Sequence, residues 1–311
     1  MVFKNIGIFL AVSFILVLFF KDSIIKTSAE QIGSSVLGAR LNISKFSWNI
    51  AASKIIVKDI TIGNPPGFEK SKFVDIPEIV VQYDPKALSK GIWHMPLALI
   101  DLKEMTVVKN DEGQLNVDAL KVLHPEKNAK IAAPPFMIDE LKLNVGKVIY
   151  KDYFKKATPE ILVYNVNFKD RVLKNIDSVP KLVGGIIMQA VKRTAIQGAG
   201  MYAAAAVMGV GFLPGAVLGV VVAKDDAIQD FPKGYGQVFD ACLKFIKDRG
   251  QLVKSDKDKG FIEGKIEGTD VKVKFEKLSW FKTRVTISAR KFMLPRREFA
   301  GGLLYQIGQR L

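Results

Sequence analysis

The stretch Lys54-Ile-Ile-Val-Lys-Asp-Ile-Thr-Ile62, directly followed by Gly63-Asn-Pro-Pro-Gly67, determines the fold class that we expect for this chain. Most residues of the first segment are β-branched, and such residues favour a strand. In the second segment, proline fixes φ and glycine permits positive φ, so the chain is expected to turn there. A strand that ends at a defined turn is therefore the first element predicted.

The same strand-like alternation continues on both sides of this stretch, from Leu41 to Lys169. Residues 96–109 alternate between apolar and polar side chains, although Glu104 interrupts the apolar positions. Further strands are expected at 136–145, at 148–151 and at 161–168. We therefore expect a twisted antiparallel sheet over residues 39–180. Its predicted apolar face includes Ile100, Leu102, Val108, Leu141, Leu143, Leu162, Tyr164 and Val166.

The amino-terminal segment, residues 1–38, has the pattern of a membrane anchor. Residues 5–20 carry no charge, and as a helix they would span about 24 Å, which snorkelling of the flanking lysines can extend. A cleaved signal peptide is the alternative. The small-x-small site Thr27-Ser28-Ala29 lies beyond several charged residues, which favours a retained anchor. A helix is expected to continue to Leu37 and to stop at Gly38. The expected anchoring side chains are Ile6, Phe9, Leu10, Phe14, Leu16 and Phe19.

Residues 181–231 are expected to form an apolar, helical segment rich in Gly and Ala. Helical periodicity begins near residue 171 and runs to residue 197. Met201–Ala223 then carries no charge and has the length of a membrane span. Its many small residues and Pro214 favour a helical hairpin that packs on protein or lies at a membrane. A second membrane span remains the alternative.

Residues 232–311 are predicted to form a separate α-β-β-β-α unit. Tyr235–Arg249 has the pattern of an amphipathic helix that ends at Gly250. Together with the sheet upstream, this unit places the chain in the α+β class. The strands are expected at Phe261–Glu267, Asp270–Lys277 and Arg284–Arg290, and the closing helix at Arg296–Leu311.

Residues suited to catalysis or metal binding are scarce. Among 311 residues there are one cysteine, Cys242, and two histidines, His94 and His124. The sequence contains no Cys/His metal spacing, no P-loop and no G-x-S-x-G motif. Cys242 falls on the apolar face of its predicted helix and is expected in the core, whereas His94 is expected at a strand end or at an interface. We therefore expect a protein that is not an enzyme and uses no cofactor and no metal.

The charge of the chain indicates which partners to expect. A formal net charge of +15 and a pI of about 9.6 fit nucleic acid, an anionic membrane surface or acidic partners. The basic residues are dispersed, whereas nucleic-acid binding usually needs a concentrated patch, so we expect no nucleic-acid partner. Lys192, Arg193 and Pro295-Arg-Arg297 flank apolar or amphipathic segments, a position that suits contact with lipid headgroups. Ordinary solvated surface is the alternative.

Four motifs follow the predicted anchor in a characteristic order. They are Leu41-Asn-Ile-Ser-Lys-Phe-Ser-Trp48, Ile60-Thr-Ile-Gly-Asn-Pro-Pro-Gly-Phe68, Val80-Val-Gln-Tyr-Asp-Pro-Lys-Ala-Leu88 and Gly113-Gln-Leu-Asn-Val117. In this order they resemble the AsmA-like family of bacterial envelope proteins, over about residues 1–180. The resemblance implies a twisted β-sheet with an apolar groove, anchored in the inner membrane and facing the periplasm. It also implies a role in phospholipid movement or outer-membrane assembly.

Two further points qualify this resemblance. The chain is far shorter than the large family members, and a groove of this length could not bridge two membranes alone. Residues 232–311 resemble a small domain of unknown function found in short bacterial lipoproteins. The residues that carry this second resemblance are Phe239-Asp-Ala-Cys-Leu-Lys and Gly264-Lys-Ile-Glu-Gly.

We therefore expect a single-pass inner-membrane protein, with its bulk in the periplasm, that contacts or helps to transfer phospholipid in outer-membrane assembly or maintenance. The apolar sheet face would contact lipid, and Lys192 and Arg193 would contact headgroups. The expected partners are membrane lipids and envelope proteins. The alternative is a structural adaptor that holds envelope proteins without transferring lipid.

Overall fold

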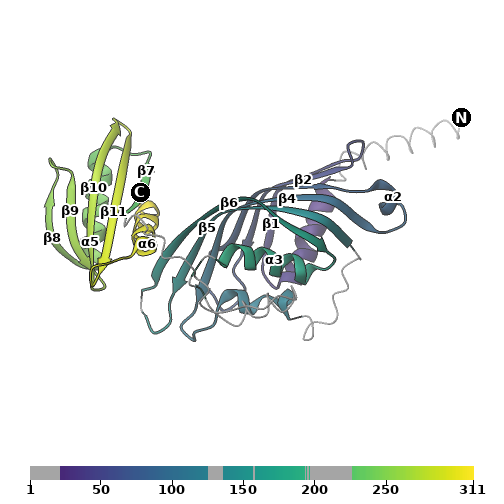
Figure 1. The fold of residues 1–311 in the computed structure, drawn as a ribbon, viewed down its shortest axis with the longest axis horizontal. Helices are drawn as coiled ribbons and strands as arrows, with labels where there is room; N and C mark the ends of the chain where they lie inside the picture. The colour runs from purple at the N-terminus through teal and green to yellow at the C-terminus, as the bar shows by residue number, and fades with distance from the viewer. Residues whose placement is uncertain (1–21, 125–135, 157, 193, 195, 197–225) are drawn as a thin grey trace, which may run out of the picture. The chain divides into compact units, whose positions relative to one another are not determined.

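Strands dominate both units of the chain in the computed structural model, which describes residues 22–124, 136–156, 158–192, 194, 196 and 226–311 (Figure 1). The first unit comprises Met1–Val148 and Asn165–Gly215. The second unit comprises Ile149–Tyr164 and Ala216–Leu311. Residues 149–164, from the middle of the chain, therefore belong with the carboxy-terminal residues.

A six-stranded meander forms the first unit, with each strand beside its sequence neighbour in the order β1-β2-β3-β4-β5-β6. Strands β1 to β4 pair antiparallel, which short turns between successive strands allow. The register places Ile43 opposite Ile60 and Ile60 opposite Ile76, and all three side chains are buried. The strands are β1 (Leu41–Asn49), β2 (Lys54–Gly63), β3 (Lys72–Gln82), β4 (Trp93–Lys109), β5 (Phe136–Asp152) and β6 (Glu160–Ile176).

Short helices accompany this sheet, and α3 lies on the concave side of its curve (Figure 1). Besides a helix over residues 22–37, the unit contains α2 (Pro85–Leu88), α3 (Val179–Val191) and two 3₁₀ helices, η1 (Asn116–Ala119) and η2 (Lys121–Leu123). The first helix ends as predicted at Gly38, which has a φ of 71° and donates its N–H to the carbonyl of Ser34. The strand and turn predicted at residues 54–67 are confirmed by β2, which ends at Gly63.

Two predictions about strand boundaries in the first unit are wrong. Residues 136–145 and 148–151 form one continuous strand, β5, because Gly146 does not interrupt pairing. A Cβ at Gly146 would lie only 2.5 Å from the carbonyl oxygen of Lys103, so this glycine permits close approach of β4.

The second error concerns residues 171–176, which belong to β6 although we expected a helix. Leu173 and Ile176 are buried three residues apart, a spacing that resembles helical periodicity. Asp170 and Asn175 have positive φ, which marks departures from regular strand geometry. The regular alternation is therefore lost in this part of β6. The helix predicted downstream is confirmed as α3.

A second sheet, covered by two helices, forms the carboxy-terminal part of the second unit. Strands β8 to β11 follow one another, and both β7 and β12 pair with β11. The strands are β7 (Asp226–Phe231), β8 (Gln251–Asp256), β9 (Phe261–Ile266), β10 (Thr269–Ser279), β11 (Lys282–Lys291) and β12 (Leu294–Pro295). The helices are α5 (Tyr235–Arg249) and α6 (Arg297–Gly308).

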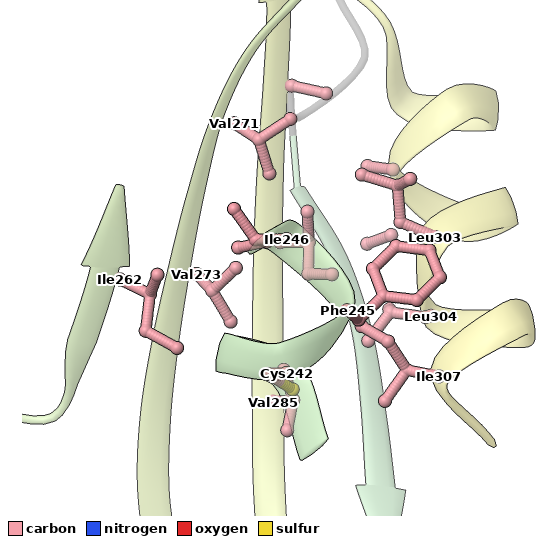
Figure 2. Packing of buried hydrophobic residues seen from close by; sticks show 14 of the residues in the cluster. Cys242, Phe245, Ile246, Ile262, Val271, Val273, Val285, Leu303, Leu304 and Ile307 are labelled. Carbon is pink, nitrogen blue, oxygen red and sulfur yellow. The ribbon is translucent and has the colours of Figure 1, made fainter. Parts of the chain in front are cut away.

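The core of this unit lies between the helices and the sheet (Figure 2). Cys242 is fully buried there, as predicted, and burial raises the pKa of its thiol to about 12. The labelled side chains that converge in this core come from α5 (Cys242, Phe245, Ile246), α6 (Leu303, Leu304, Ile307) and the strands (Ile262, Val271, Val273, Val285).

The predicted α-β-β-β-α order is correct for α5, β9, β10, β11 and α6 but misses three strands. Residues 226–231 were expected in the helical segment and instead form β7, which pairs with β11. Strand β8 was missed because five of its six residues are polar or exposed, and β12 has only two residues. Short edge strands of this kind give little periodic signal.

The hairpin end formed by residues 149–164 packs within the second unit. Leu162 contacts the core just described, and Tyr305 of α6 packs against Ile149, Ile161 and Val163. Arg296 donates a hydrogen bond of 2.5 Å to Glu160. Burial alone would raise the pKa of Glu160, but hydrogen bonds from Lys156 and Arg296 outweigh it and lower the pKa.

No helix in the described part of the chain combines the length and apolarity needed to cross a membrane. The predicted anchor, with Ile6, Phe9, Leu10, Phe14, Leu16 and Phe19, lies outside the described residues, as does the Gly/Ala-rich segment 201–223. Their membrane roles therefore stay predictions.

Candidate functional site

The apolar side chains predicted on β4 and β5 gather in the interior of the first unit. Leu102, Leu141 and Leu143 have no exposed surface, and Ile100 and Val108 are also buried. On β4 the predicted alternation holds from Ala98 to Leu102, and Met105 to Val108 are then all buried. The apolar face is thus present but covered by other parts of the chain.

Short helical segments pack on one another and on β4. Helix α3 packs on η2, and η1 packs on β4. The buried residues of α3 include Gly184 and Gly185, two residues of low helix propensity in the middle of the helix. A helix with two central glycines gains little stability from its own sequence and depends on its packing.

The predicted apolar face does not extend over the start of β6. Leu162 packs against the carboxy-terminal core, whereas its neighbours Ile161 and Val163 are buried elsewhere, with Ile149. Tyr164 is only half-buried, although Val166 is buried. Leu162 and Tyr164 both belong to the second unit and are separate from the β4–β5 cluster.

Two of the sequence motifs meet at a buried amide. Asn116 has no exposed surface, and its Nδ2 donates to Asn64 Oδ1 at 2.7 Å and to the carbonyl of Thr106 at 2.8 Å. Its Oδ1 accepts from the backbone N–H of Val108 at 3.0 Å. Asn64 in turn donates to Ser71 Oγ and to the carbonyl of Glu69. The Gly-Asn-Pro-Pro-Gly turn is therefore fastened to the Gly-Gln-Leu-Asn segment beside β4.

The other two motifs meet through aromatic side chains. Trp48 donates from Nε1 to the Tyr83 hydroxyl at 2.9 Å, and its ring lies 6.1 Å from the Tyr83 ring. Trp93 lies 6.5 Å from Trp48. Asp84, next to Tyr83, accepts from the N–H groups of Lys86 and Ala87 and caps α2. These contacts give the motif residues a structural role that the sequence alone did not reveal.

Helix 22–37 protects the outer edge of the sheet at β1. Glu30 Oε1 accepts from the N–H of Ile43 at 2.6 Å, and Ser34 Oγ accepts from the N–H of Leu41 at 2.9 Å. Asp22 accepts from the N–H of Trp48. Side chains thus satisfy donors that an edge strand would otherwise expose to other strands. The sequence signal for this role is a polar residue every four positions, at 22, 26, 30 and 34.

His94 lies near the start of β4, as predicted, between two carboxylates. Its Nε2 lies 2.9 Å from Asp139 and its Nδ1 lies 3.7 Å from Asp84. The hydrogen bond to Asp139 is the main cause that raises the pKa of His94 above its usual 6.5. A hydrogen bond from the backbone of Lys86 is the main cause that lowers the pKa of Asp84. His94 thus lies between Asp84, which caps α2, and Asp139 on β5, and these carboxylates favour its protonated form.

The remaining predicted site residues form no common cluster. Lys192 follows the last residue of α3, and Arg193 lies outside the described residues. No group of three or more His, Cys, Asp or Glu side chains within the described ranges could hold a metal ion. Of the predicted site residues that the structure describes, those on β4 and β5 form a set of buried apolar side chains.

These residues define a class of architecture. It is a curved antiparallel meander with one covered apolar face, followed by an α+β unit. The chain matches the model of the AsmA family over residues 2–207, about two thirds of its length, and belongs to that family. The family is associated with assembly and maintenance of the cell envelope. No curated protein sequence matches the chain significantly. The match ends before residue 232, so the resemblance suggested for the carboxy-terminal domain stays a prediction.

Proposed function

We propose that the chain is a non-enzymatic protein of the bacterial envelope that contacts phospholipid acyl chains with the β4–β5 face of its first sheet. The proposal includes a retained inner-membrane anchor within residues 1–38 and a periplasmic location for the bulk of the chain. The observation that carries it is the set of buried apolar side chains on β4 and β5 (Ile100, Leu102, Val108, Leu141, Leu143). Membership of the AsmA family supports the envelope setting.

Lipid access to this face requires displacement of its covering elements, because Leu102, Leu141 and Leu143 are completely covered. Helix α3, which lies on the concave side of the sheet (Figure 1), is the element that we propose to move. Its central Gly184 and Gly185 each lower helix propensity by about 1 kcal/mol relative to alanine, so packing has to hold it in place. An acyl chain could replace that packing with apolar contacts of the same kind.

The test is photo-crosslinking of the full chain, reconstituted in vesicles, to a phospholipid that carries a diazirine in its acyl chain. Adducts mapped to β4 and β5 are the expected result. Adducts confined to residues 1–21 would show that only the predicted anchor contacts lipid, and would contradict the proposal.

Two isosteric substitutions provide a matched comparison. Val108→Thr adds a hydroxyl to the β4–β5 face and is expected to lower the crosslinking yield there, because an apolar chain would have to cover an unpaired polar group. Val285→Thr makes the same change in the core of the second unit, where Val285 is equally buried. It is expected to leave the yield on β4 and β5 unchanged.

The second candidate function is a structural adaptor in the envelope. The complete covering of Leu102, Leu141 and Leu143 favours it, because a closed face can serve as an ordinary core. In that case, crosslinking in cells should give protein adducts without lipid adducts.

A further inference from the structure

The turn between β11 and β12 carries the most exposed apolar side chains in the described part of the chain. Lys291 pairs with Leu294, so the turn itself consists of two residues, Phe292 and Met293. Phe292 is 87% exposed, Met293 is 88% exposed and Leu294 is 69% exposed. Three consecutive apolar side chains are thus exposed at this turn.

The backbone of this tip is unusual for such residues. Phe292 has a φ of 51° and Met293 a φ of 66°, both in the left-handed region. Two-residue hairpin turns with this geometry favour Asn, Asp and Gly, because bulky side chains are strained there. Neither side chain gains packing in return, since both are almost fully exposed. Phe292 and Met293 thus depart from the residue preference of this turn, and no packing compensates for the backbone strain. Such a departure indicates that function constrains these positions.

Basic residues flank the tip on both sides, at Arg290 and Lys291 before it and at Arg296 and Arg297 after it. Arg296 is engaged with Glu160. Lys291 and Arg297 form no ion pair with any residue that the structure describes. Residues 226–311 as a whole carry 18 Lys and Arg against 11 Asp and Glu. An apolar wedge with unpaired positive charges at its base is complementary to an anionic bilayer surface.

A second apolar tip, Trp280 and Phe281, lies at the other end of β11. Trp280 is 81% exposed, and the two rings pack edge to face at 5.0 Å. The nearby charges of Lys282 and Arg284 are, however, paired with Asp230. The ten residues of β11 separate the two tips by roughly 33 Å. If the strand points into a flat bilayer at one tip, the other tip therefore stays in water.

We propose that Phe292, Met293 and Leu294 insert into the interfacial region of a bilayer that contains anionic phospholipid, with Lys291 and Arg297 against the headgroups. This contact is independent of lipid binding by the β4–β5 face, because it involves only residues of the second unit.

The experiment uses the full chain with Met293→Cys, labelled with an environment-sensitive fluorophore and reconstituted in vesicles. Native Cys242 stays unlabelled, because it is fully buried and its thiol pKa is raised to about 12. In phosphatidylethanolamine–phosphatidylglycerol vesicles, we expect blue-shifted emission that spin-labelled acyl chains quench. Phe281→Cys, at the opposite tip, is the matched control and should retain water-like emission. Water-like emission at position 293, or equal quenching at both tips, would overturn the proposal.

The contribution of charge has its own test. The double change Lys291→Gln and Arg297→Gln should lower insertion at position 293 on the order of 30-fold, since each basic residue near an anionic surface contributes about fivefold. Vesicles of phosphatidylcholine alone should give a similar loss. Insertion that does not respond to either change would contradict the headgroup contact. Protection of position 293 in whole envelopes but not in vesicles would identify a protein partner and would also overturn the proposal.

Discussion

Asn116 illustrates how single side chains hold the first unit together. Its amide satisfies the N–H of Val108 and the carbonyl of Thr106 on β4, and it reaches Asn64 in the turn between β2 and β3. The motifs that contain Asn64 and Asn116 are visible in the sequence. Their contact is not, because 52 residues separate them and no periodicity links a turn to a buried amide.

Asn116→Ala should therefore destabilise the first unit by about 2–4 kcal/mol, since it leaves the N–H of Val108 and the carbonyl of Thr106 buried without partners. Urea unfolding of the full chain in a mild detergent measures this loss. Asn42→Ala removes a partly buried amide that accepts a solvent-exposed hydrogen bond from nearby Arg40, and should change stability by less than about 0.5 kcal/mol. Equal losses of stability in the two variants would show that the buried amide of Asn116 contributes no more to stability than the amide of Asn42.

His94 gives the first unit a pH dependence. Its pKa is raised in the folded protein, mainly by Asp139, so its stabilisation is fully present below the unfolded value of about 6.5. That stabilisation is lost as pH rises through the higher folded pKa. Thermal unfolding between pH 5.5 and 8.5 should show this decline in the native chain, and His94→Asn should remove it. A decline that persists in the variant would assign the pH dependence to another group.

At the level of elements, helix 22–37 and the edge strand β1 form a pair that the sequence predicted only in part. The end of the helix at Gly38 followed from its glycine, whereas the contact with β1 depends on tertiary structure. Sequence patterns likewise gave α3, α5 and most strands, but missed β7, β8 and β12. These strands are short, and their neighbours in the sheet, more than their own periodicity, decide their conformation.

The double change Glu30→Ala and Ser34→Ala should open the edge of β1. The N–H groups of Ile43 and Leu41 lose their acceptors, and their hydrogen exchange should become about tenfold faster. Hydrogen exchange with mass spectrometry on residues 41–49 measures the change. Gln31→Ala, on an exposed position of the same helix, should leave this exchange unchanged. If the two variants exchange alike, the helix does not protect the edge.

A glycine substitution in helix α6 tests how tightly the second unit is packed. A Cβ at Gly302 would overlap the carbonyl oxygen of Ile161, so Gly302→Ala should destabilise this unit by about 1–3 kcal/mol. Gly236 in α5 has room for a Cβ, and Gly236→Ala should raise stability by up to about 1 kcal/mol. The rate at which a maleimide labels buried Cys242 reports the opening of this unit. Faster labelling in Gly236→Ala than in Gly302→Ala would contradict the packing described.

For the whole molecule, composition and alternation predicted the α+β class, and the motif order predicted the AsmA family, which the match over residues 2–207 confirms. The covering of the apolar face could not be predicted, because alternation shows which side chains share a face but not what packs on it. The structure shows that Leu102 and Leu141 are buried, whereas their contact with lipid stays a proposal.

The most direct test of that proposal is photo-crosslinking in intact cells grown with a photoreactive leucine analogue. Leu102 on β4 and Leu141 on β5 have no exposed surface and belong to the buried apolar set, so they report contacts of the face without a disruptive substitution. If the β4–β5 face contacts lipid, mass spectrometry should find phospholipid adducts on the peptides that contain residues 102 and 141. Only intramolecular links, or links to envelope proteins without phospholipid, would contradict the account.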